Sequence, residues 1–255
     1  MAQITAALIS TNFGYLLLTF LPPILWLLFY LQEDRHPEPK HLLALAFIGG
    51  VFSAGLAVIV ELFLIGEHGG VFSGYFSLQE RVFGFFLIIG LVEEYVKYLP
   101  IKFLILKRLD FNEPVDGMIY MMTSALGFAA IENALFVFPL FRENLFIGLE
   151  VATNRFLGAN LLHALCSGIV GFFLARAFFR PWRHHFVAIG IIIATLLHAT
   201  FNYLILVREV LPEGTFYLIL LLSIMAAMVL IDFERLKNLP PQQESPVPNP
   251  EGSEL

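Results

Sequence analysis

The stretch LVEEYVKYLP, residues 91–100, places two glutamates and a lysine inside a long apolar segment at about 82–106. About 20 apolar residues are enough to cross the bilayer core as a helix. An ionised side chain at the centre of such a helix costs roughly 2.5–3.5 kcal/mol on insertion scales. Glu93, Glu94 and Lys97 therefore cannot face lipid as free charges, and the stretch predicts a membrane helix packed around a polar interior.

The composition extends this interpretation to the rest of the chain. Of 255 residues, 58% are hydrophobic and 14% are charged, whereas a typical soluble domain has about 45–50% apolar and about 25% charged residues. The formal net charge is −6, and no basic run suits nucleic acid. These features predict a polytopic membrane protein that is surrounded by the lipid bilayer and has no nucleic-acid partner.

Seven segments are long and apolar enough to span a membrane. They lie near 11–31, 42–65, 82–106, 115–139, 157–179, 186–207 and 215–233. A shorter apolar piece at 145–151 fits a re-entrant or interfacial helix, so we expect six to eight spans. The predicted fold class is all-α: a polytopic membrane helix bundle with about seven transmembrane helices and a polar intramembrane cavity.

The chain is predicted to form one membrane-embedded domain, residues 1–237, with its functional core at 82–207. Residues 238–255 are Pro-rich, polar and acidic, and they predict a disordered tail because they cannot bury a core. Lys and Arg are more frequent in the loops on the side of this tail. The positive-inside rule then places the N-terminus outside and the C-terminus in the cytoplasm.

Glu93 and Glu94 precede Lys97 by four and three residues, so all three side chains share one helix face. An acid that is N-terminal to its basic partner is the favourable order for an ion pair. One ion pair lowers the cost of one carboxylate and leaves the second unexplained. Adjacent acids are a common source of a general acid or base, but a structural ion pair that holds two helices together fits the same three residues.

The next three predicted spans also carry polar side chains in apolar surroundings: Glu132 and Asn133, then Asn160 and His163, then His198 and Asn202. A lone membrane histidine is more often a hydrogen-bond donor between helices than a catalyst. Two histidines on consecutive spans, each with an asparagine on its own helix face, favour a shared site. Counting the helical rise from the predicted span ends places these groups at a similar depth, which predicts one cavity open toward the external side.

The order of these motifs resembles the PrsW family of intramembrane proteases. EEYVK at 93–97 matches an EExxK signature, and EPVDGMIYMMTSALGFAAIENALF at 113–136 is similar to the long hallmark of the family. RFLGANLLHALCSGIVG at 155–171 and LLHATFNYL at 196–204 match the later blocks. The resemblance covers about 93–205, in order, and extends to the type II CAAX prenyl proteases and their bacterial relatives.

This resemblance implies an intramembrane endopeptidase that cleaves a membrane-anchored protein. The namesake activity of the family is site-1 cleavage of an anti-sigma factor. By resemblance, Glu93 and Glu94 are the core acids, one of which activates water, and Glu132 stands where CAAX-type relatives usually have a histidine. The predicted catalytic residues are Glu93, Glu94, Glu132, His163, His198 and Asn202, with Lys97, Asn133 and Asn160 in supporting roles.

Amide hydrolysis needs an activated water, a donor for the oxyanion and a proton for the leaving amine. Glu93 or Glu94 is predicted to be the base, and Lys97 to keep the other acid ionised. His198 and Asn202, one helical turn apart, are predicted to donate to the oxyanion. The sequence has no HExxH motif, which argues against a zinc protease of that type.

The cofactor is left open between Zn²⁺ and none. The candidate metal ligands are Glu93, Glu132, His163 and His198, residue types that bind zinc in proteins, and a metal-free glutamate mechanism uses the same residues. Two other classes of function also stay open. Buried Glu, Lys and His are typical of proton- or ion-coupled transporters, although no paired halves are detected, and a non-catalytic membrane binding protein fits the same fold. The predicted location is the bacterial plasma membrane.

Overall fold

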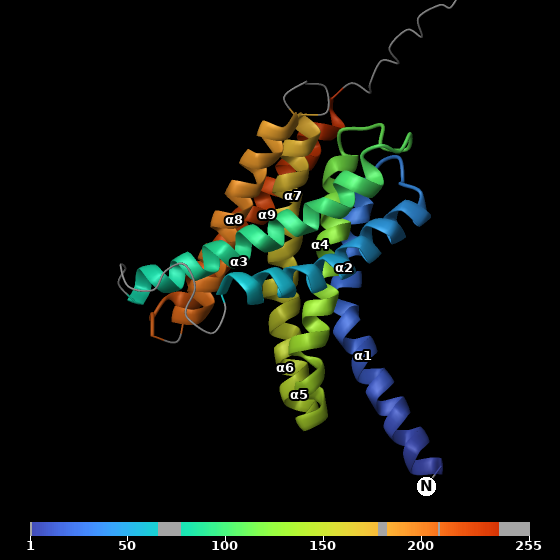
Figure 1. Cartoon of the computed structure of the whole chain (residues 1–255), viewed down its shortest axis with the longest axis vertical. Coiled ribbons are helices and arrows are strands. Elements are labelled where there is room, and N and C mark those ends of the chain that lie inside the picture. Colours follow the sequence, from blue (N-terminus) through green and yellow to red (C-terminus); the bar gives the residue numbers. More distant parts are fainter. Residues whose placement is uncertain (1, 66–77, 178–182, 209, 240–255) are drawn as a thin grey trace, which may run out of the picture.

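A computed structural model describes residues 2–65, 78–177, 183–208 and 210–239, which form helices joined by turns and contain no strand (Figure 1). The elements are α1 (Ala2–Tyr30), the 3₁₀ helix η1 (Leu31–Glu33), α2 (Lys40–Ile65), α3 (Leu78–Pro100), the π-helix η3 (Ile101–Ile105), α4 (Asp116–Phe136), α5 (Phe138–Glu143), α6 (Leu145–Arg155), the π-helix η4 (Phe156–Asn160), α7 (Leu161–Arg176), α8 (Arg183–Val207) and α9 (Gly214–Lys237). The predicted all-α class is confirmed.

Six helical stretches within the described residues are long and apolar enough to cross a membrane: 12–33, 40–64, 116–143, 145–176, 185–207 and 214–237. The chain is therefore an integral membrane protein, and the count lies within the predicted range. The remaining predicted span, at 82–106, lies in α3 and η3, and α3 carries Glu93, Glu94 and Lys97 within its apolar part. The predicted disordered tail lies outside the described residues from 240 onward.

The apolar piece at 145–151 is not a separate re-entrant segment. It forms part of α6, which continues through η4 into α7 as one helical stretch from 145 to 176. Asn144 caps the start of α6, because its side-chain oxygen accepts hydrogen bonds from the backbone N–H groups of Phe146 and Ile147. This single long helix carries Arg155 at the end of α6 and His163 at the start of α7.

The helix α4 lies at the centre of the bundle, where it packs against α1, α2 and α7, and most of its side chains are buried. The contact with α2 is a backbone contact. A Cβ atom on Gly50 would lie 1.9 Å from the carbonyl oxygen of Ser124, and one on Gly127 would lie 2.0 Å from that of Phe47. Small residues permit this close approach between membrane helices, so the two glycines determine how near α2 comes to α4.

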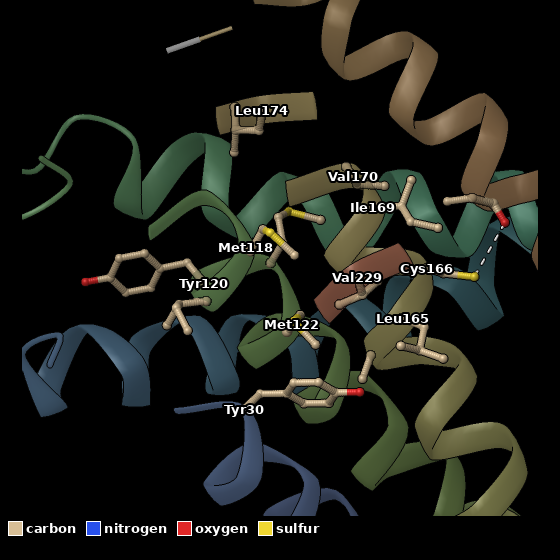
Figure 2. Packing of buried hydrophobic residues seen from close by; sticks show 14 of the residues in the cluster. Tyr30, Met118, Tyr120, Met122, Leu165, Cys166, Ile169, Val170, Leu174 and Val229 are labelled. Atoms are coloured by element: carbon tan, nitrogen blue, oxygen red, sulfur yellow. Dashed lines mark hydrogen bonds between the residues drawn. The ribbon is translucent and has the colours of Figure 1, made fainter. Parts of the chain in front are cut away.

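The main hydrophobic cluster lies where α4, α7 and α9 meet. Figure 2 shows Met122 of α4, Ile169 of α7 and Val229 of α9 as members of this cluster. Cys166 is buried there, and its thiol donates to the carbonyl oxygen of Ala194 at 3.6 Å (Figure 2). The cluster joins α7 firmly to its neighbours and holds the start of α7 in position.

In Figure 1, α3 runs across the bundle and lies beside α8 and α2. Its last turn is followed directly by η3, because Pro100 has no N–H to donate to the carbonyl of Val96. The Ser124 hydroxyl of α4 donates to the carbonyl of Lys97 at 2.8 Å. This hydrogen bond ties α4 to the charged turn of α3.

Candidate active site

Charged and polar side chains from four helices meet inside the bundle. They are Glu93, Glu94 and Lys97 from α3, Glu132 from α4, His163 from α7 and His198 from α8. All are buried except Glu132, which is partly exposed. The structure thus brings together five of the six predicted catalytic residues, together with the predicted supporting lysine.

The ammonium group of Lys97 lies at the centre of this cluster. It donates to Glu93 Oε2 at 3.1 Å, to Glu94 Oε1 at 2.9 Å and to His163 Nδ1 at 2.8 Å, so all three of its protons are used. Because His163 Nδ1 accepts this hydrogen bond, we assign its proton to Nε2, which donates to Glu132 Oε2 at 2.6 Å.

Glu94 is fully buried, and donors surround it. Its Oε1 accepts from Lys97 and from His198 Nδ1, both at 2.9 Å, and its Oε2 accepts from the Ser167 hydroxyl at 3.3 Å. A carboxylate can only accept, so Nδ1 of His198 carries the proton and Nε2 of that ring is left as an acceptor. Glu94 therefore orients His198 and has little access to a substrate.

Glu93 differs from Glu94 because it lines a cavity of about 520 Å³, whose wall also includes Glu132, Arg155 and Asn202. Its Oε2 lies 3.7 Å from His198 Nε2, the ring nitrogen that Glu94 leaves free. A water molecule held by Glu93 would therefore lie next to an imidazole acceptor and to the open cavity. Asn202, the sixth predicted catalytic residue, lines this cavity and is not one of the residues around Lys97.

A second set of polar contacts lies behind Glu132. Arg155 donates from Nη2 to Glu132 Oε2 at 3.0 Å and from Nε to Asn133 Oδ1 at 2.6 Å. The amide of Asn133 in turn donates to Asn160 Oδ1 at 3.1 Å and to the carbonyl of Thr19 in α1 at 3.2 Å. The two predicted supporting asparagines thus hold Arg155 and Glu132 in place and link the site to α1.

Two residues of the cavity wall, Arg155 and Glu61, were not predicted as site residues. Arg155 begins the RFLGAN block that resembles the family, and this position is its signal in the sequence. Glu61 of α2 lines the same cavity as Glu93. Its signal in the sequence is an acid within an apolar span, which is by itself a reason to suspect function.

The ligand atoms of Glu93, Glu94, His163 and His198 lie within 4.8 Å of one another. These four side chains could hold a metal ion, since carboxylates and imidazoles are zinc ligands. Glu94 takes the place of Glu132 in the predicted ligand set, because Glu132 is paired with His163 and Arg155 instead.

The position of Lys97 decides whether these ligands fit a metal ion as they are arranged. Its ammonium group occupies lone pairs on Glu93, Glu94 and His163, three of the four candidate ligands. A divalent cation cannot use the same lone pairs and would also lie next to a positive charge. The arrangement of these side chains therefore does not fit a bound metal ion while Lys97 is protonated.

The chain is similar to known proteins over most of its length. Residues 38–228 match the family model described as "PrsW family intramembrane metalloprotease". A curated Protease PrsW of Clostridioides difficile (strain 630) is 29% identical over 196 residues, covering 75% of this chain and 79% of that relative.

Two further proteins named Protease PrsW show the same degree of similarity. The one from Geobacillus kaustophilus (strain HTA426) is 30% identical over 182 residues, 71% of this chain and 74% of its own. The one from Bacillus subtilis (strain 168) is 28% identical over 179 residues, which cover 69% of this chain and 75% of that relative. No solved structure matches the chain significantly. These matches give the transporter interpretation no support. The chain belongs to the PrsW family of intramembrane metalloproteases, and it is an intramembrane protease.

Proposed function

We propose that this protease hydrolyses a peptide bond of a membrane-anchored protein with a water molecule activated by Glu93. The observation that carries the proposal is the difference between the two adjacent acids. Glu93 lines the cavity, whereas Glu94 is buried with hydrogen-bond donors on both of its oxygens. A general base must reach the proton that it removes, and of these two acids Glu93 is the one with access to a substrate.

In this proposal, Glu93 holds the water in the cavity and accepts its proton as the water attacks the scissile carbonyl carbon. Lys97 holds the carboxylate of Glu93 in place, because its ammonium group lies 3.1 Å from Glu93 Oε2. His163 receives the third hydrogen bond of Lys97, and its own proton is held by Glu132. These two residues keep the ammonium group pointed at the two acids.

His198 and Asn202 are one helical turn apart on α8, so their side chains share a helix face. Because Nε2 of His198 is left as an acceptor, we assign proton transfer to this ring in place of the predicted donation to the oxyanion. Nε2 lies 3.7 Å from Glu93 Oε2 and can pass a proton from that acid to the leaving amine. Asn202 lines the cavity and can donate its amide hydrogen to the oxyanion. No step of this proposal uses a metal ion.

The first experiment replaces the base. Glu93→Gln is expected to lower kcat for a single-span reporter protein by about 10²–10⁴-fold, the usual contribution of a general base, without lowering the unfolding temperature of the purified protein. Glu150→Gln, which changes an exposed acid of α6, is the matched control. Unchanged cleavage by the Glu93 variant would rule out this acid as the base.

The second experiment addresses the metal ion. The purified protein is tested for zinc by elemental analysis, and cleavage is measured after treatment with a chelator. We expect less than one zinc per chain and undiminished cleavage, because Lys97 occupies the ligands. Loss of cleavage that Zn²⁺ restores would contradict the metal-free proposal and agree with the description of the family as metalloproteases.

The proposed setting is the plasma membrane of a bacterium, with the N-terminus outside and the C-terminal tail in the cytoplasm. This orientation requires α3 to cross the membrane in addition to the six stretches identified among the described residues, because only an odd number of spans places the termini on opposite sides. The excess of Lys and Arg in the loops on the side of the tail supports this orientation. A substrate cut near its external face, such as an anti-sigma factor with one span, fits the resemblance. Protease protection of a tag on the tail in sealed cells tests the orientation, since a tag that is cleaved from outside would reverse it.

A further inference from the structure

Glu61 is an acidic residue of the active-site cavity that the proposed mechanism does not use. It lies near the end of α2 and lines the same cavity as Glu93 and Asn202. Most of the remaining wall is apolar, formed by residues such as Ala57, Phe86 and Leu206. Glu61 is therefore a polar group on the otherwise apolar α2 side of the cavity.

The carboxylate of Glu61 is incompletely satisfied. Its Oε1 atom is buried and has no hydrogen-bond partner among the described residues. Buried polar atoms are normally paired, and an exception requires an explanation. A residue that merely extends into water or lipid headgroups would expose this oxygen. The acceptor instead points into the protein without a donor, as expected for a group whose partner arrives with a ligand.

The charges around the cavity favour a cationic partner. Lys97 is shared between Glu93 and Glu94, and Arg155 is shared between Glu132 and Asn133. In the part of the chain that the structure describes, the salt bridges thus leave Glu61 without a cation. A cavity with low-dielectric walls and excess negative charge concentrates positive ligands.

We propose that Glu61 is a substrate-binding residue whose carboxylate binds a lysine or arginine side chain close to the scissile bond. The inference rests on the proposed function and adds a specificity to it. The long apolar stem of such a side chain can lie along the apolar cavity wall while its charged end reaches the acid. Glu61 then positions the substrate chain between α2 and the catalytic residues of α3 and α8.

The test uses a library of single-span reporter proteins in which the residues flanking the span are randomised. Purified protein and library are reconstituted into liposomes, and the cleaved products are identified by mass spectrometry. For the unaltered protein, we expect Lys and Arg to be enriched at least fivefold at one position relative to the cut. Glu61→Gln should abolish the enrichment, and Glu61→Lys should replace it with an enrichment of Asp and Glu.

A pair of reporters that differ only in Lys or Glu at the enriched position gives the kinetic form of the test. Glu61→Gln should raise KM for the Lys reporter about tenfold and change kcat less than twofold, because a binding residue does not take part in the chemical step. Glu61→Lys should lower KM for the Glu reporter below the value for the unaltered protein. A purely structural role of Glu61 would not produce this exchange of preference. Glu150→Gln and Glu150→Lys are the controls and should keep the original preference.

The outcomes separate the two proposals. If cleavage depends on Glu93 and both Glu61 variants keep the original preference, the inference about Glu61 is overturned and the proposed function stands. A loss of cleavage in the Glu61 variants that is equal for every reporter also overturns the inference about Glu61. If Glu93→Gln cleaves normally, or the unaltered protein cleaves no reporter, the proposed function fails. The isosteric Glu61→Gln keeps the test valid even if the lysine variant does not fold.

Discussion

Two groups of buried acids in this protein differ in what compensates their charge. In the proposed active site, Glu93 and Glu94 share the ammonium group of Lys97. In the second group, Glu38 lies buried before α2 next to Asp116 at the start of α4. Glu38 accepts a hydrogen bond from the hydroxyl of Tyr120. The first group faces a cavity, and the second connects a loop to a helix.

Among the described residues, no salt bridge joins the second group to a lysine or arginine, and hydrogen bonds satisfy it instead. Asp116 accepts hydrogen bonds from the backbone N–H groups of Asn112 and Glu113, both at 2.8 Å. Burial, together with the hydrogen bond to Asp116, raises the pKa of Glu38 to about 9, against the opposing effect of the Tyr120 hydroxyl. Glu38 is thus neutral at pH 7. Its own proton neutralises the carboxylate, whereas the ammonium group of Lys97 compensates the charge of Glu93 and Glu94.

The comparison shows how the surroundings of a buried carboxyl group separate chemistry from structure. A carboxylate that is kept charged by a cation and is open to a cavity can remove a proton from water. A carboxyl group that keeps its own proton and is enclosed by a tyrosine hydroxyl and a second acid can only join two segments. Four substitutions test this difference, and the largest effect is expected where the compensating cation is removed.

Lys97→Met should have the largest effect on stability. It leaves two adjacent buried carboxylates without their cation, and breaking a buried ion pair from one side costs about 3–5 kcal/mol. The free energy of unfolding in detergent measures the loss. An equally stable Lys97 variant would show that the active-site acids are also held by their own protons, and the contrast with Glu38 would disappear.

Glu94→Gln should lower kcat by about 10–100-fold, the range found when a residue that orients a catalytic group is replaced. The Glu94 carboxylate accepts a hydrogen bond from Nδ1 of His198 and so fixes the orientation of the ring. An amide can both donate and accept, so it no longer selects this orientation. Steady-state kinetics with a single-span reporter provide the measurement. Glu38→Gln, a change of the same chemistry in the second group, should leave kcat unchanged. An equal loss of kcat in both variants would contradict the separation of roles.

Tyr120→Phe should cost about 1 kcal/mol of stability, the usual net contribution of one hydrogen bond. The substitution removes the donor to Glu38 and keeps the aromatic ring in the core. Chemical denaturation gives the difference in free energy, and cleavage of the reporter should be unaffected. A large loss of activity would mean that the second group of acids communicates with the active site.

The smallest expected effect is a dependence on pH. A carboxyl group with a raised pKa in the folded state stabilises the fold fully below its unfolded pKa, and this contribution declines as the pH rises toward the folded value. For Glu38 the decline runs from about pH 4.5 to about pH 9. Glu38→Gln cannot ionise in the folded or the unfolded state, so its unfolding temperature relative to that of the unaltered protein should rise between pH 5 and pH 8.

The change in stability between pH 5 and pH 9 is compared for the variant and the unaltered protein. The contributions of the other titratable groups, which both proteins share, then cancel. The remaining titratable groups around Glu38 are Asp34, His36, Glu113, Asp116 and Tyr120. Burial also raises the pKa of Asp34, which adds a decline of the same sign that the variant retains. If the variant and the unaltered protein lose stability in parallel between pH 5 and pH 9, Glu38 is not the neutral acid described above.

The sequence alone predicted the helical membrane class and most of the residues that meet in the site. Hydropathy is a local property, so the seven long helices follow from it, including α3 with its charged turn. The spacing of Glu93, Glu94 and Lys97 along one helix determines that they share a face. The cost of charge in lipid then requires that this face is turned inward.

The tertiary structure decided which groups these side chains meet. Rotation and separation of helices depend on packing, such as the backbone contacts at Gly50 and Gly127, and no local pattern encodes them. Packing therefore turned Glu93 to the cavity, enclosed Glu94 and placed Glu61 and Arg155 in the same wall. The sequence determined that charge had to be buried, and only the fold decided which of the two adjacent acids lines the cavity.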